Sequence, residues 1–312
     1  MRSIIALATM LLGLLPLASQ VRITETDEAV HVFVADKPVL TYNTDTVQPP
    51  EGVERLYERS GFIHPLYSPS GKVLTDAFPI GHVHQHAIFN AWTRTTFKHE
   101  VVDFWNQHGG TGTVKHSKLG SVKDNSFEAE LQQVSLKQGP ALKEEWEIKV
   151  KDSRDPFIID LEIEQECATE NEVYLHPYHY GGLAFRGSGH WSPEDEARYE
   201  GSMKVLTGEG VSSIEDSNHT RPKWIAVYGK IEQAQAGFVV MDHPSNFRYP
   251  QSIRVHPRMP YFVFSPVIDG SFIIKPRFTY QANYRIITFD GEPDVERIEA
   301  WYKDFVRGNA KK

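Results

Sequence analysis

Cysteine is almost absent from this chain of 312 residues, because Cys167 is the only one. A single cysteine excludes an intrachain disulfide, so the fold must rely on its hydrophobic core. Basic residues are also in deficit, with 33 Lys and Arg against 41 Asp and Glu and a net charge of −8. Phosphate binding needs a basic surface, so this balance argues against nucleic acid as a partner.

Several common catalytic signatures are missing as well. The chain has no Gly-rich phosphate loop and no paired Cys-x-x-Cys. Gly187-Ser188-Gly189 lacks the strand-turn-helix context of a hydrolase nucleophile. Any chemistry must therefore be carried by other residue types.

Long apolar runs are absent after residue 20. Before it, Met1-Arg2-Ser3 is followed by an apolar run from Ile4 to Ala18, which is short for a membrane span. This layout is typical of a secretory signal peptide, so we expect residues 1–20 to be removed and the protein to be periplasmic or secreted, with an uncleaved N-terminal anchor as the alternative. No later stretch has membrane length, and nothing marks a domain boundary, so we expect one β-sandwich domain over residues 21–312.

Apolar residues alternate with polar ones along much of the chain, which is the pattern of half-buried strands. The last segment differs, because apolar residues recur there at helical spacing between Pro293 and Gly308, which predicts a helix over residues 294–307. Many strands with one closing helix favour a mostly β protein, a large antiparallel β-sandwich with a C-terminal helix. The predicted strands cover residues 30–34, 127–131, 145–150, 158–163, 224–228, 237–241 and 284–289.

Histidines gather in three places, and the first is the run from Gly81 to Phe89. On an extended strand His82, His84 and His86 would project from one face, where they could transfer protons or bind a divalent metal. The outer two would start about 13 Å apart on a straight strand, so a tripod requires a bend. We therefore favour acid/base use of His84 over a metal site, and keep a divalent metal as the alternative cofactor.

The second and third clusters mix histidine with other polar residues. His176, Tyr178 and His179 precede a glycine pair that lets a ligand approach closely. The segment 241–250 carries a carboxylate, an imidazole, an amide and a guanidinium, which suit a hydroxylated or carboxylated ligand, although an Asx turn with a structural arginine is an equal alternative. Its polar residues are Asp242, His243, Asn246 and Arg248.

Beyond single residues, the block from Leu56 to Asp76 with the histidine run, and the later segments 242–246 and 259–266, resemble the PmoA-like family of exported bacterial proteins. The family label comes from a methane monooxygenase subunit, but that subunit is a membrane protein, so we do not carry its function over. The resemblance instead implies carbohydrate metabolism and a galactose-mutarotase-like supersandwich, and His176–His179 resembles the histidine-bearing strand of sugar mutarotases.

Two hypotheses of function follow. The first is an enzyme that epimerises, eliminates or cleaves a sugar or oligosaccharide, with His84 and His179 moving protons and His176, Asp242 or His243 assisting. The second is a non-catalytic glycan-binding protein with Trp92, Trp105, Trp191 and Tyr261 as stacking platforms. Clustered histidines favour the enzyme, and we expect the three clusters to line one cleft. The candidate substrate-binding residues are Arg59, His64, Tyr178, Trp191, Asn246 and Arg248.

Overall fold

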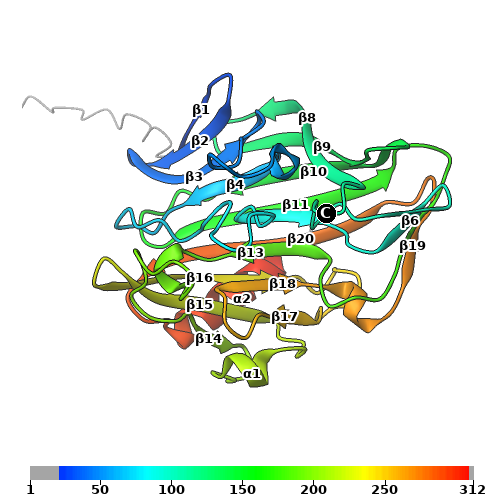
Figure 1. Cartoon of the computed structure of the whole chain (residues 1–312). Coiled ribbons are helices and arrows are strands. Elements are labelled where there is room, and N and C mark those ends of the chain that lie inside the picture. Colours follow the sequence, from blue (N-terminus) through cyan, green and yellow to red (C-terminus); the bar gives the residue numbers. More distant parts are fainter. Residues whose placement is uncertain (1–20, 309–312) are drawn as a thin grey trace, which may run out of the picture.

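Two large antiparallel sheets dominate the computed structural model, which describes residues 21–308 (Figure 1). The signal peptide predicted for residues 1–20 lies outside the described residues. The first sheet has the strand order β1-β2-β3-β4-β5-β13-β18-β17. Its strands are β1 (Val21–Glu25), β2 (Ala29–Val34), β3 (Lys37–Asn43), β4 (Phe62–Leu66), β5 (Ile88–Ala91), β13 (Gly182–Arg186), β17 (Ile253–Val255) and β18 (Tyr261–Phe264).

The second sheet has the order β14-β15-β16-β20-β11-β10-β9-β8. Its strands are β8 (Gly112–Val122), β9 (Ser126–Ser135), β10 (Gly139–Val150), β11 (Phe157–Cys167), β14 (Lys204–Thr207), β15 (Trp224–Ile231), β16 (Ala234–Asp242) and β20 (Tyr280–Asp290). A small sheet of β6 (Thr95–Phe97), β7 (Glu100–Val102), β12 (Val173–Leu175) and β19 (Phe272–Ile274) lies at one end (Figure 1).

Helices are few. The described chain contains α1 (Ile214–Ser217), α2 (Val295–Gly308) and three 3-10 turns at Arg55–Tyr57, Gly189–Trp191 and Pro266–Asp269. The expected large antiparallel β-sandwich with a C-terminal helix is therefore confirmed, and each strand predicted from alternation is present. Within residues 21–308, no helix is both long and apolar enough to cross a membrane.

The main core lies between the two large sheets, because alternation turns one face of each strand inward. Phe185 of β13 stacks on Phe262 of β18 at 4.8 Å between ring centroids, and it also meets Phe238 of β16, across the sandwich, at 5.9 Å. Tyr42 of β3 meets Trp146 of β10 at 6.0 Å in the same way. These contacts identify the inward face of the first sheet, and so also the face that points away from the core.

The outward face of the second sheet is divided in two. Along β15, β16 and β20 it carries a second hydrophobic cluster that α2 covers with Ile298, Tyr302 and Phe305 (Figure 1). Along β9, β10 and β11 it carries rows of carboxylates, since Glu145 pairs in register with Glu130 and Glu164 on the two flanking strands. The next row repeats this arrangement with Glu147 between Glu128 and Glu162.

Candidate functional site

Polar side chains collect on the face of the first sheet that points away from the core. Phe185 and Phe262 point inward, so their neighbours Arg186 and Tyr261, which are directly paired across β13 and β18, point outward. Arg254 of β17 lies on the same face, because it pairs with Val263. The sheet therefore supplies two arginines and a tyrosine as the floor of the candidate site.

The histidine run forms a turn above this floor and not the extended strand that we expected. Gly81 has a φ of +77°, the His82 amide donates to Pro79 O, and the Gln85 amide donates to His82 O at 3.0 Å. The turn brings the His82 and His84 rings to 5.9 Å from each other. It also places His84 at 5.7 Å from the ring of His108.

Four imidazoles therefore form one cluster, since His82 also lies 6.4 Å from the ring of His256, which follows β17. Burial first, and then the neighbouring His82, His108, Arg186 and Arg59, lower the pKa of His84 to about 4. The pKa of His256 is likewise lowered to about 4, first by burial and then by Arg254. Both rings are consequently neutral near pH 7 and able to accept a proton.

His86 does not join this cluster, so His82, His84 and His86 do not form the metal tripod that we kept as an alternative. The His86 ring is fully buried, its Nε2 lies 3.0 Å from Tyr57 O, and it packs at 4.7 Å against the ring of Phe78. The turn that joins His82 to His84 rotates His86 into the interior. Among residues 21–308, no group of three or more His, Cys, Asp or Glu side chains is placed to hold a metal ion.

Arg59 is the most unusual group at the site. It is 1% exposed, its guanidinium lies 4.6 Å from the Phe89 ring centroid, and Nη1 donates a long 3.4 Å hydrogen bond to Phe104 O. Its Nε and Nη2 are buried without a hydrogen-bond partner in the described chain. Burial lowers the pKa of Arg59 to about 10, although Glu144, Tyr261 and Asp103 oppose this effect at longer range.

Arg186 is likewise a buried arginine whose hydrogen bonds are incomplete. It is fully buried, Nη1 donates to Gln85 Oε1 at 2.9 Å and Nη2 to Ser192 Oγ at 3.0 Å. Its Nε has no hydrogen-bond partner among residues 21–308, and burial lowers its pKa. Because Arg59 and Arg186 both affect the pKa of His84 and of Tyr261, the two arginines lie close to the same two side chains.

An aromatic group borders the arginines. The rings of Trp105 and Tyr180 are stacked at 5.7 Å with an angle of 24° between their planes. Tyr180 also meets Tyr261 at 5.8 Å, and His179 meets Tyr180 at 4.5 Å. His179 therefore belongs to the edge of this site, as expected, and burial lowers its pKa.

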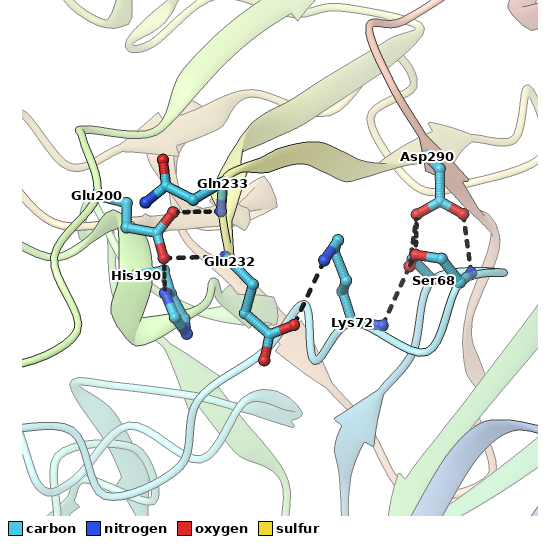
Figure 2. Close-up of polar contacts among 8 residues, drawn as sticks. Ser68, Lys72, His190, Glu200, Glu232, Gln233 and Asp290 are labelled. Carbon is cyan, nitrogen blue, oxygen red and sulfur yellow. Dashed lines mark hydrogen bonds and ion pairs between the residues drawn. The ribbon is translucent and has the colours of Figure 1, made fainter.

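One long loop, residues 187–202, completes the site with Ser192 and with Glu194, whose Oε2 lies 3.1 Å from His82 Nδ1. Figure 2 shows how Glu200 fastens this loop to the turn between β15 and β16. Its carboxylate accepts from the amides of Glu232 at 2.9 Å and Gln233 at 2.8 Å, and it lies 2.9 Å from His190 Nδ1. The loop is thereby held where Ser192 meets Arg186.

The segment 241–250 does not reach this site, which corrects our expectation that all three clusters converge. Asp242 accepts from the Gln251 amide and from Asn246 Nδ2, each at 2.7 Å, and His243 packs on Phe305 of α2 at 4.9 Å. Contact with α2 places His243 on the outward face of the second sheet. These contacts match the structural alternative, a turn that hydrogen-bonds to itself.

Arg248 also has a structural environment. Its Nη1 donates to Pro266 O and Gly270 O, both at 2.6 Å, and Nη2 donates to Ser271 O at 3.0 Å. Three carbonyls thus occupy the guanidinium that we expected to hold a substrate. Its role as seen in the structure is to fix the loop between β18 and β19.

Tyr178 lies at the aromatic edge of the site, with its ring 4.0 Å from that of His179 and 6.3 Å from that of Tyr180. Other predicted site residues lie apart from the histidine cluster. His176 adjoins the small sheet, with its Nε2 at 2.8 Å from Thr96 Oγ1. His64 Nδ1 lies 3.0 Å from Thr75 Oγ1, and His64 lines a separate cavity of about 670 Å³. Trp191 is fully buried, and its Nε1 donates to Lys230 O at 3.0 Å.

Sequence patterns did not reveal seven members of the site: Arg186, Arg254, His108, Tyr180, Ser192, Glu194 and His256. Arg186 carried a usable signal, because a charged residue ending the otherwise apolar strand Gly182–Arg186 must find a special environment. The two histidines stand alone in their segments, and only the fold brings them to His82 and His84.

Comparison with known proteins assigns the chain to a protein family. The model of DUF6807, a family of unknown function, matches residues 29–303, so the chain belongs to this family. The PmoA-like family that the motifs suggested is therefore wrong, because the family model that matches is a different one. No curated protein matches the chain.

Similar solved structures share little sequence with this chain. Heparan sulfate lyase HepC from Pedobacter heparinus is 9% identical over 88% of this chain, which spans 35% of HepC, with a TM-score of 0.39. A galactose mutarotase related enzyme from Lactobacillus acidophilus is 9% identical over 86% of this chain and 97% of its own, with a TM-score of 0.36. A GalM/aldose epimerase homologue from C. elegans is 9% identical over 88% and 100%, with a TM-score of 0.37. At such TM-scores the likenesses carry no argument about activity.

Proposed function

We propose that this protein is an enzyme that acts on a sugar or oligosaccharide by proton transfer, with neutral His84 as the base. The observation that carries the proposal is the convergence of buried, incompletely hydrogen-bonded polar groups on one face of the first sheet. Such groups cost stability, and proteins retain them where a ligand completes their hydrogen bonds.

His84 is the best placed residue for proton transfer. Its ring stands between those of His82 and His108, and its lowered pKa keeps it unprotonated throughout the neutral range. His82 faces Glu194, whose Oε2 lies 3.1 Å from His82 Nδ1 and fixes the orientation of that ring. His84 thus offers a proton acceptor beside a second, oriented imidazole, and proton transfer is the step that epimerisation, elimination and glycosidic cleavage share.

Aromatic rings next to hydrogen-bonding groups support a sugar as the substrate. Tyr180, which is half-buried and stacks on Trp105, offers an apolar ring face, and the imidazoles beside it offer groups that can bind hydroxyls. The alternative of a non-catalytic glycan-binding protein loses all four of its expected platforms, because none is more than 1% exposed: Trp92, Trp105, Trp191 and Tyr261.

A glycan panel incubated with the protein and read by mass spectrometry tests the proposal. His84→Gln should lower turnover by about 100- to 10,000-fold, the usual contribution of a general base. His31→Gln is the matched control, because His31 pairs with Thr41 between β2 and β3, away from the site, and should retain full activity. Turnover that is equal in the two variants would end the assignment of His84.

The exported location predicted from residues 1–20 remains part of the proposal, and detection of the protein in a periplasmic or culture-medium fraction tests it.

A further inference from the structure

Two buried arginines of the site have no carboxylate partner. In the described residues neither Arg59 nor Arg186 forms an ion pair within 4.0 Å, although both are at most 1% exposed. From this we infer that the enzyme's substrate is an anionic sugar, whose carboxylate or sulfate oxygens bind Arg59 and Arg186. The inference rests on the proposed function and adds the chemical class of the substrate to it.

The third buried arginine of the described chain is compensated by carboxylates. Arg285 is 3% exposed, and it donates to both carboxylate oxygens of Asp160 at 2.6 and 2.9 Å and to Asp304 at 2.8 Å. The two buried arginines without a carboxylate, Arg59 and Arg186, both lie at the candidate site.

The carboxylates nearest to the two arginines are already engaged. Asp76 is close enough to affect the pKa of Arg186, but its hydrogen bond from a guanidinium comes from Arg198 at 2.9 Å. Glu194 is held at His82. Glu144, the carboxylate with the largest effect on the pKa of Arg59, accepts from the side-chain amides of Asn90, Gln133 and Gln165. Asp103, which also affects that pKa, accepts from the amides of Trp105 and Asn106. An oxyanion from outside the protein is thus the missing partner.

The positions of the free nitrogen atoms suit such a ligand. Arg59 has Nε and Nη2 unpaired, and two neighbouring guanidinium nitrogens match the two oxygens of a carboxylate or sulfate. Arg186 has Nε unpaired beside Tyr261, its cross-strand partner. The rest of a sugar ring would then lie against Tyr180 and the imidazoles. Because the free nitrogens are shielded from solvent in this structure, the side chains that cover them must move aside when the oxyanion binds.

Titration calorimetry on the intact protein tests the inference. The probes are short oligosaccharides of galacturonate, glucuronate and mannuronate, each beside its neutral methyl ester, together with a sulfated disaccharide and its unsulfated form. At least one anionic probe should bind about 10- to 100-fold more tightly than its neutral counterpart, the range expected for charge-assisted hydrogen bonds. Tightest binding of the sulfated probe would identify the oxyanion as a sulfate. Equal binding within every pair overturns the inference.

Variants assign the effect to the arginines. Arg59→Gln and Arg186→Gln should each remove most of the preference for the anionic probe, whereas Arg55→Gln, at a side chain that is 80% exposed, should leave it unchanged. If either variant fails to fold, Arg59→Lys and Arg186→Lys give the answer, because lysine keeps the positive charge but lacks the two neighbouring nitrogens that bind both oxygens of an oxyanion. An unchanged preference for the anionic probe in both lysine variants would contradict the inference.

The outcomes separate this inference from the proposed function. Preferential binding of an anionic probe with no turnover of any glycan would support the arginine assignment and refute the enzyme. Turnover of neutral glycans, unchanged in both arginine variants, would support the enzyme and refute the anionic substrate.

Discussion

A buried arginine without an ion-pair partner should lower the stability of the ligand-free protein, and the substitution Arg59→Met measures by how much. Burial holds the pKa of Arg59 at about 10, against 12.5 for an ordinary arginine. At about 1.4 kcal/mol per pH unit, this difference corresponds to roughly 3 kcal/mol of destabilisation of the charged form. Methionine fills a similar volume and needs no hydrogen-bond partner.

The substitution also loses favourable contacts. The 3.4 Å hydrogen bond to Phe104 O and the stacking on Phe89 together contribute about 1–2 kcal/mol. The net expectation is that Arg59→Met makes the free protein about 1–2 kcal/mol more stable. A gain of this size should raise the melting temperature by about 2–4 °C for each kcal/mol.

Arg285→Met is the matched comparison, because Arg285 is equally buried but paired. Its loss leaves Asp160 and Asp304 without their guanidinium, and since both carboxylates are partly exposed we expect a loss of about 2–3 kcal/mol. Urea denaturation followed by circular dichroism measures both variants without ligand. If Arg59→Met destabilises the protein as much as Arg285→Met does, Arg59 is a structural residue and the reasoning fails.

Three further predictions follow from the same structure. The pKa values of His64, His84 and His256 are about 4 in the folded protein, below the ordinary 6.5, so these residues take up protons when the protein unfolds. Stability should therefore fall as the pH decreases from about 6.5 to 4, and melting curves across this range will check the sign. Asp242→Ala should cost about 2–4 kcal/mol in urea denaturation, because two buried donors lose their acceptor; a loss of turnover at unchanged stability would instead make Asp242 part of the chemistry. Chelation followed by dialysis should leave the melting temperature and turnover unchanged, because His86 faces the interior, and recovery of a lost activity on adding zinc would show otherwise.

The fold was largely predictable because its information is local. Alternation such as Glu145-Trp146-Glu147-Ile148 defines a strand and its buried face within a few residues, and the apolar spacing at Ile298, Tyr302 and Phe305 does the same for α2. These patterns do not depend on which strands become neighbours.

The site was less predictable because its geometry is not local. A strand was the natural interpretation of the alternating His82, His84 and His86, but Gly81 at positive φ and the hydrogen bond from Gln85 to His82 O make the segment a turn. The unpaired state of Arg59 depends on residues brought together from distant parts of the chain. In the segment 241–250, the polar residues that suggested a ligand bind other parts of the protein, since Asp242 accepts from Asn246 and the Gln251 amide and Arg248 donates to carbonyls of residues 266–271.

The rows of carboxylates on β9, β10 and β11 carry a consequence for how the protein behaves in concentrated solution. Glu130, Glu145 and Glu164 repel one another across adjacent strands, which costs some stability in each molecule. The same repulsion acts between molecules, because two copies that brought these broad flat faces together would confront one acidic surface with another. The repulsion is felt most by Glu145, whose pKa is raised by burial and then by Glu128, Glu164 and Glu130. Acidification should therefore remove the charge of Glu145 early and weaken the repulsion between copies, and light scattering as the pH is lowered measures whether self-association increases.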